Sequence, residues 1–133
     1  MKNNKLKKQN HVTYDCNYHL IWTPKYRKSL LINGVDDDLK EIIQELSIEL
    51  EFEIISMEIM PDHVHLLVSI SPQLGVHKVI KRIKGRSSNI LRKKYQNLRT
   101  KVPTLWTHSY FCATVGGAPL EVIKKYVEDQ KEV

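Results

Sequence analysis

The chain has 133 residues, of which 41% are hydrophobic and 27% charged, a composition typical of one soluble globular domain rather than of a disordered polypeptide. No apolar run approaches the roughly 20 residues that a membrane helix needs, and the Lys- and Asn-rich residues 1–10 lack the apolar core of a secretory signal. Membrane, secreted and disulfide-stabilised classes are therefore excluded. We expect one domain over residues 1–133, in the cytoplasm, with residues 1–10 as a flexible basic tail.

The formal net charge of +6 is concentrated in one part of the chain. Residues 78–101 contain ten basic side chains and no acidic one, and the rest of the chain is mildly acidic. A concentrated basic segment indicates a site for a polyanion, with nucleic acid as the leading candidate. The alternative is a helix face that is merely solvated.

The first half of the chain predicts one strand, one helix and two further strands. Residues 13–22 alternate between polar and apolar side chains, as in a strand with one buried face. Three aspartates at 36–38 predict the start of a helix, and apolar residues at helical spacing extend it to about residue 51. Residues 52–60 and 63–70 are then predicted as strands on either side of a Pro61-Asp62 turn.

The second half predicts a helix, a strand and a terminal helix. An apolar stripe runs through residues 75–95, a loop is expected at 97–103, and a fourth strand lies within 106–115. The last helix begins near residue 120. The order β-α-β-β-α-β, followed by a helix, predicts an α+β fold of the ferredoxin-like or RRM-like type, an antiparallel sheet with two helices on one face. Because this fold hosts many functions, the site has to decide among them.

A His-x-His pair is the sharpest motif. On a strand, His63 and His65 project to one face, while Val64 and Leu66 project to the other, apolar face. Two imidazoles on one face can share a divalent metal. Two half-exposed histidines without a ligand would give the same pattern, and two ligands hold a metal poorly, so the metal hypothesis requires a third.

The terminal helix contains a candidate third ligand. Tyr126 and Gln130 are four residues apart and therefore lie on one face of that helix. A glutamine oxygen can bind a hard divalent ion, and a phenolate beside that ion can attack a phosphorus that the ion has made more electrophilic. The alternative is a tyrosine packed on the sheet and a surface glutamine.

Five ordered segments give the chain a family resemblance. It resembles the HUH single-tyrosine transposases of the insertion-sequence 200/605 family, in which U is a bulky hydrophobic residue, here Val64. The segments that carry the resemblance are residues 18–27, 60–67, 83–88, 105–106 with 109–111, and 123–127 with Gln130.

The resemblance implies a role for each of four residues. Tyr126 would attack a DNA phosphate and become joined to the 5′ end, and His63, His65 and Gln130 would hold Mg²⁺ or Mn²⁺. The substrate would be single-stranded DNA with hairpins near the ends of a mobile element. The resemblance also implies a homodimer in which the tyrosine helix of one subunit completes the site of the other. The glycines in the 115–118 tether permit either placement of that helix.

Other side chains have weaker assignments. Asp62 is either an orienting partner of a histidine or a turn residue, and His19 is a further candidate near the site. Tyr95, Trp106 and Tyr110 either stack on bases or pack in the core. The residues expected to hold DNA phosphates are Lys78, Lys81, Arg82, Lys84, Arg86, Arg92, Lys93 and Lys94.

Three other functions stay open at this point. A non-catalytic RNA- or DNA-binding module of the same fold would carry an aromatic motif on a central strand, and no such segment occurs here. A metal-dependent nuclease would use water as the nucleophile and leave no covalent adduct. A domesticated relative acting on repeated genomic hairpins would share every site residue named above.

Overall fold

The computed structural model describes residues 6–115 and 120–132. Four antiparallel strands form the central sheet in the order β4-β5-β3-β6. Their bounds are β3 Asn17–Trp22, β4 Glu53–Met60, β5 His63–Ser69 and β6 Phe111–Thr114. The strands β5 and β3 are central, and Ile21 of β3 lies opposite both His65 of β5 and Phe111 of β6. This order confirms the predicted ferredoxin-like α+β fold.

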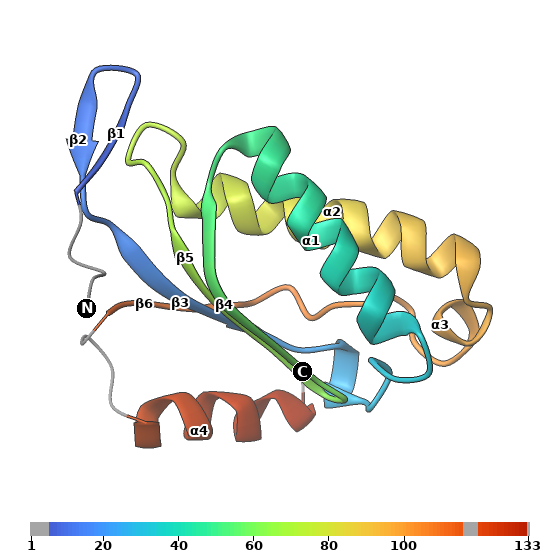
Figure 1. Cartoon of the computed structure of the whole chain (residues 1–133). Coiled ribbons are helices and arrows are strands. Elements are labelled where there is room, and N and C mark those ends of the chain that lie inside the picture. Colours follow the sequence, from blue (N-terminus) through green and yellow to red (C-terminus); the bar gives the residue numbers. More distant parts are fainter. Residues whose placement is uncertain (1–5, 116–119, 133) are drawn as a thin grey trace.

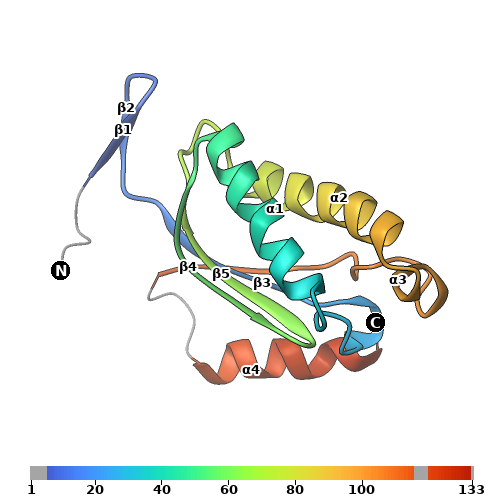
Figure 2. The ribbon, with the colours of Figure 1, turned by 45° about the vertical axis from the view of Figure 1, so that its right-hand side comes forward.

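The main core lies between one face of the sheet and the helices α1 (Val35–Leu50) and α2 (Val76–Lys94), as Figures 1 and 2 show. Leu20, Val64 and Leu66 point to this face and are fully buried. The alternation along β5 therefore directs His63 and His65 to the opposite face.

Helix α4 (Leu120–Asp129), followed by the short helix η2 (Gln130–Glu132), lies on that opposite face of the sheet (Figures 1 and 2). The ring of Tyr126 packs on that of Phe111, with centroids 5.4 Å apart. Since Phe111 and His65 both lie opposite Ile21, they share one face of the sheet. The fold thus places the tyrosine helix and the two histidines on the same side.

The N-terminal region differs from the prediction. Instead of one strand over 13–22, a hairpin of β1 (Lys7–Gln9) and β2 (Val12–Tyr14) precedes β3 and projects beyond the sheet in Figure 1. Asn10 and His11 form the two-residue turn with φ of 50° and 68°, the left-handed conformation that a tight hairpin requires. Residues 7–9 of the expected tail form β1, and residues 1–5 lie outside the described part.

Three other boundaries shift. The aspartates at 36–38 lie in the first turn of α1 rather than before it, because Gly34 occupies the cap position with φ of 100°. The loop expected at 97–103 begins with the short helix α3 (Asn97–Thr100). The fourth strand is confined to β6, while Trp106 forms an isolated bridge with Pro24. In the described part of the chain no helix is long and apolar enough to cross a bilayer.

Candidate active site between the sheet and helix α4

His63 is oriented by the residue before it. Its Nδ1 lies 2.9 Å from Oδ1 of Asp62, and Asp62 also forms an ion pair with Arg27, with Nε and Oδ2 3.2 Å apart. A carboxylate at Nδ1 favours the tautomer with the proton on that nitrogen, which leaves Nε2 free as a ligand atom. The structure therefore places Asp62 as the orienting partner of His63.

His65 contacts a histidine of the neighbouring strand. Nδ1 of His19 and Nε2 of His65 are 3.0 Å apart, and both rings lie on the α4 face. Burial and the neighbouring His19 lower the pKa of His65 from its ordinary value. The neutral imidazole, which is the form that binds metals, is therefore favoured at this position.

Tyr126 and Gln130 meet at a serine. Oγ of Ser109 lies 3.1 Å from the Tyr126 hydroxyl and donates to Oε1 of Gln130 at 3.2 Å. Because the serine proton points at Gln130, the phenol of Tyr126 donates to Oγ. Burial raises the pKa of Tyr126, although the bond to Ser109 opposes the shift. The phenol is therefore protonated near neutral pH, and Gln130 is only 6% exposed.

Arg27 joins the two halves of the site. Besides pairing with Asp62, its Nη1 donates to the carbonyl of Val127 at 3.4 Å and lies 3.6 Å from Oε2 of Glu128. It therefore ties α4 to the start of β5. Within residues 6–115 and 120–132, no hydrogen bond joins His63 or His65 directly to Tyr126 or Gln130.

The ligand chemistry fits a divalent metal held by two histidines and an amide. Among the described residues, no group of three or more His, Cys, Asp or Glu side chains is arranged so that it could hold a metal. The buried carboxamide of Gln130 has an oxygen of the kind that Mg²⁺ or Mn²⁺ accepts, so Gln130 is the candidate third ligand.

Sequence reasoning gave no role to Arg27 or Ser109 and left His19 as a weak candidate. All three act through contacts with residues distant in the chain. Only the alternation of β3 pointed to His19, because it put that residue on the polar face. Arg27 and Ser109 lie in segments that carry the family resemblance, but nothing in their local pattern indicates these contacts.

The eight basic residues predicted to hold phosphates all lie on α2, on the other face of the sheet from α4. Several already have partners in the fold. Arg82 and Arg86 both pair with Glu49, at 2.6 and 2.9 Å, and Lys94 pairs with Asp38 at 2.8 Å. In the described part of the chain, those without an ion pair or a bond to a backbone carbonyl are Lys78, Lys81 and Lys93.

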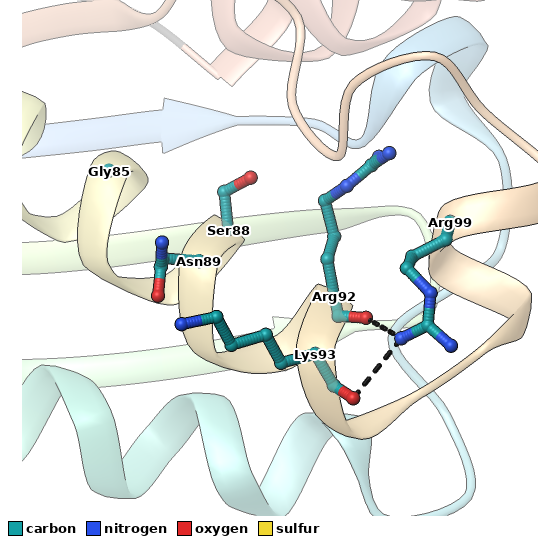
Figure 3. Close-up of a pocket in the computed structure, with 6 residues that line it drawn as sticks. All are labelled: Gly85, Ser88, Asn89, Arg92, Lys93 and Arg99. Carbon is teal, nitrogen blue, oxygen red and sulfur yellow. Dashed lines mark hydrogen bonds between the residues drawn. The ribbon is translucent and has the colours of Figure 1, made fainter.

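The outer surface of α2 is hollowed on both sides of Gly85. One hollow of about 570 Å³ lies toward α3, where Arg99 donates to the backbone carbonyls of Arg92 and Lys93 (Figure 3). In that view Ser88 and Arg92 leave α2 in the same direction, as expected for residues four apart. A second hollow of about 420 Å³ lies between α2 and residues 104–110.

Of the three aromatic residues considered for base stacking, Trp106 packs in the core. It is 5% exposed, donates from Nε1 to Ser87 and packs edge-on against Trp22. Tyr95 donates to Asp38, and Tyr110 is half-buried with its hydroxyl 2.9 Å from Nδ1 of His77.

The sequence is similar to known transposases over nearly its whole length. Residues 12–130 match the family model described as transposase, IS200-like. The ISDra2 transposase TnpA of Deinococcus radiodurans is 39% identical over 129 residues, which cover 96% of this chain and 92% of that protein. The transposase for insertion sequence element IS200 of Salmonella typhimurium is 28% identical, over 92% of this chain and 81% of that protein.

Two solved structures resemble this chain in fold. A candidate transposase from Deinococcus radiodurans R1 superposes with a TM-score of 0.80 at 34% identity, covering 93% of this chain and 97% of the other. A REP-associated tyrosine transposase bound to a REP hairpin gives 0.58 at 12% identity, covering 92% and 68%, which indicates a shared fold. The fold and these similarities together define a DNA transposase. The chain belongs to the IS200-like transposase family.

Proposed function

We propose that this transposase, acting in the cytoplasm, cleaves and rejoins single-stranded DNA at insertion-sequence ends through a 5′-phosphotyrosine intermediate on Tyr126. The observation that supports this most is the meeting of Tyr126 and Gln130 at Ser109, on the same sheet face as His63 and His65. The proposed nucleophile and the proposed third ligand are thus held together on the sheet face that also carries the two imidazoles. His63, His65 and Gln130 are the proposed ligands of Mg²⁺ or Mn²⁺.

The reaction conserves the number of phosphate ester bonds. The Tyr126 oxygen forms a bond to phosphorus as the bond from phosphorus to the 3′ oxygen breaks, and the phenolic proton leaves while the 3′ oxygen gains one. Ser109 is the hydrogen-bonded neighbour of that phenol and fixes the direction of its proton. Because the phosphotyrosine keeps the energy of the ester, the free 3′-OH of a second strand can reverse the step without a nucleotide cofactor.

Each remaining residue has a supporting task. A divalent metal at the proposed ligands would polarise the phosphate and stabilise its added charge. Asp62 holds His63 with Nε2 free, and His19 contacts the His65 ring at its Nε2. Arg27 keeps α4 against the start of β5, so that the nucleophile and the ligands share one site.

The reaction class is tested with single-stranded DNA that carries the ends of the native element. The protein is incubated with this DNA, labelled on the 3′ side of the expected cut, and Mg²⁺, and is then run on a denaturing gel. We expect a slower protein band that carries the label and is absent in EDTA. Cleaved DNA without any labelled protein would instead indicate water as the nucleophile.

We also propose that DNA phosphates lie along α2, where Lys78 and Lys81 are exposed. Lys81 lines the hollow beside residues 104–110, and Lys78 precedes it by three residues on the same helix. Replacing both with alanine is expected to weaken DNA binding and to lower the slope of log K against log salt by about 1.4, since each lost contact to a single strand contributes about 0.7. Affinity is measured by fluorescence anisotropy at salt concentrations from about 50 to about 300 mM, over which phosphate contacts weaken measurably.

The matched control removes the same charge elsewhere. Lys8 and Lys40 are exposed and lie outside α2, and replacing both with alanine is expected to leave the salt slope unchanged. Equal slopes for the two double variants would place the phosphate contacts somewhere other than α2.

Finally, we propose that the active form is a homodimer in which α4 of each subunit completes the site of the other. In the single chain α4 lies on its own sheet and is held by Arg27, Ser109 and Phe111. Exchange of α4 between identical subunits would remake the same contacts across the interface, so its energetic cost is low.

A further inference from the structure

Lys84 differs from the other lysines of α2 in its surroundings. It is half-buried, and its Nζ donates to the backbone carbonyls of Thr107 at 2.6 Å and Ser109 at 3.0 Å. Burial lowers the pKa of Lys84 to about 8. Lys78 and Lys81, on the same helix, are exposed. Lys84 is therefore built into the fold, in contrast to the two lysines that precede it.

The segment that Lys84 holds is the one that touches the tyrosine. Thr107 is anchored independently, because its N–H donates to the carbonyl of Thr23 at 3.1 Å. The carbonyl of Ser109 accepts hydrogen bonds from Lys84 and, at 3.3 Å, from the hydroxyl of Thr107. On its other side, the hydroxyl of Ser109 contacts Tyr126. A short chain of contacts thus connects α2, on one face of the sheet, to α4 on the other.

We propose that Lys84 is a positioning residue for the nucleophile: it fixes Ser109, and through the Ser109 hydroxyl it sets the places of Tyr126 and Gln130. This inference rests on the proposed function. An ammonium has three donors on a flexible stem, and two of them are used here on neighbouring carbonyls. Hydrogen bonds from a charged donor are stronger than neutral ones, so their loss frees the segment that ends in Ser109.

The test compares Lys84→Met with Lys81→Met. Both variants lose one positive charge from α2 and keep a long, helix-forming side chain, but only the first loses the bonds to Thr107 and Ser109. At saturating DNA, we expect Lys84→Met to form the DNA adduct at least about tenfold more slowly than Lys81→Met. Lys84→Met should bind DNA at least as tightly as Lys81→Met does. Lys84→Arg should recover part of the rate, because a guanidinium can still donate to both carbonyls.

A double variant tests the route through Ser109. If Lys84 acts by holding that serine, Lys84→Met combined with Ser109→Ala reacts no more slowly than Ser109→Ala alone. Rate effects that multiply would overturn the proposal. So would a Lys84→Met variant that binds DNA more weakly than Lys81→Met but reacts normally at saturation, because Lys84 would then be a phosphate contact.

Hydrogen exchange separates a failure of this inference from a failure of the proposed function. Without DNA or metal, backbone amides in residues 105–111 and 120–130 are expected to exchange faster in Lys84→Met than in Lys81→Met. Equal exchange in the two variants would refute the positional role, whatever the reaction proves to be. A wild-type protein that forms no adduct while this exchange difference holds would count against the function alone.

Discussion

A Tyr126→Phe variant is expected to form no covalent adduct with DNA and to cleave none, while it still folds and binds DNA. The change removes the attacking oxygen but keeps the ring that packs on Phe111. It also removes the hydrogen bond to Ser109, whose loss should cost about 1 kcal/mol of unfolding free energy. The denaturing gel measures the adduct, and thermal unfolding measures the cost to the fold.

Tyr110→Phe is the matched control. It also removes one phenol hydroxyl with a single hydrogen-bonded partner, here His77, at a site next to Ser109 in the sequence. We expect this control to form the adduct at close to the wild-type rate. Cleavage by Tyr126→Phe at close to that rate would contradict the assignment of the nucleophile.

Mixing two inactive proteins is expected to restore activity. His63→Ala alone should be inactive because a proposed metal ligand is missing, and Tyr126→Phe alone because the nucleophile is missing. If α4 completes the partner's site, a mixed dimer contains one whole site, which combines the histidines of the Tyr126→Phe subunit with the tyrosine of the other. DNA should then be attached only to the His63→Ala chain, as mass spectrometry of the adduct would show.

The outcome of the mixture depends on where each site is built. If α4 works on its own sheet, as it lies in the single chain, every site in the mixture carries one lesion. Inactivity despite subunit exchange, demonstrated with two differently tagged chains, would therefore reject the shared site and retain the arrangement within one subunit.

The sequence predicted the fold because its patterns are local. The alternation through 63–70 correctly separates His63 and His65 from the buried Val64, and the helical spacing along α1 and α2 marks the faces that form the core. The hairpin of β1 and β2 escaped prediction because its turn uses Asn10 and His11, a pair without the glycine that usually signals such a turn.

The site was predictable only in part, because its supporting contacts span long distances in the sequence. Arg27 reaches Val127, one hundred residues away, and His19 reaches His65 across two strands that are far apart in the chain. The charge pattern of α2 also does not show which basic residues are paired within the fold, since Glu49 of α1 forms ion pairs with both Arg82 and Arg86. Counting basic residues overstates how many remain free for a phosphate.

The position of the sheet between α2 and α4 has a consequence for the length of the substrate. Under the proposed function, phosphates held along α2 and the phosphate cut by Tyr126 lie on opposite faces of the four strands (Figures 1 and 2). A rigid duplex cannot turn around the edge of the sheet within so short a distance. An unpaired stretch therefore has to separate the two contacts, and the thickness of the domain sets its shortest workable length.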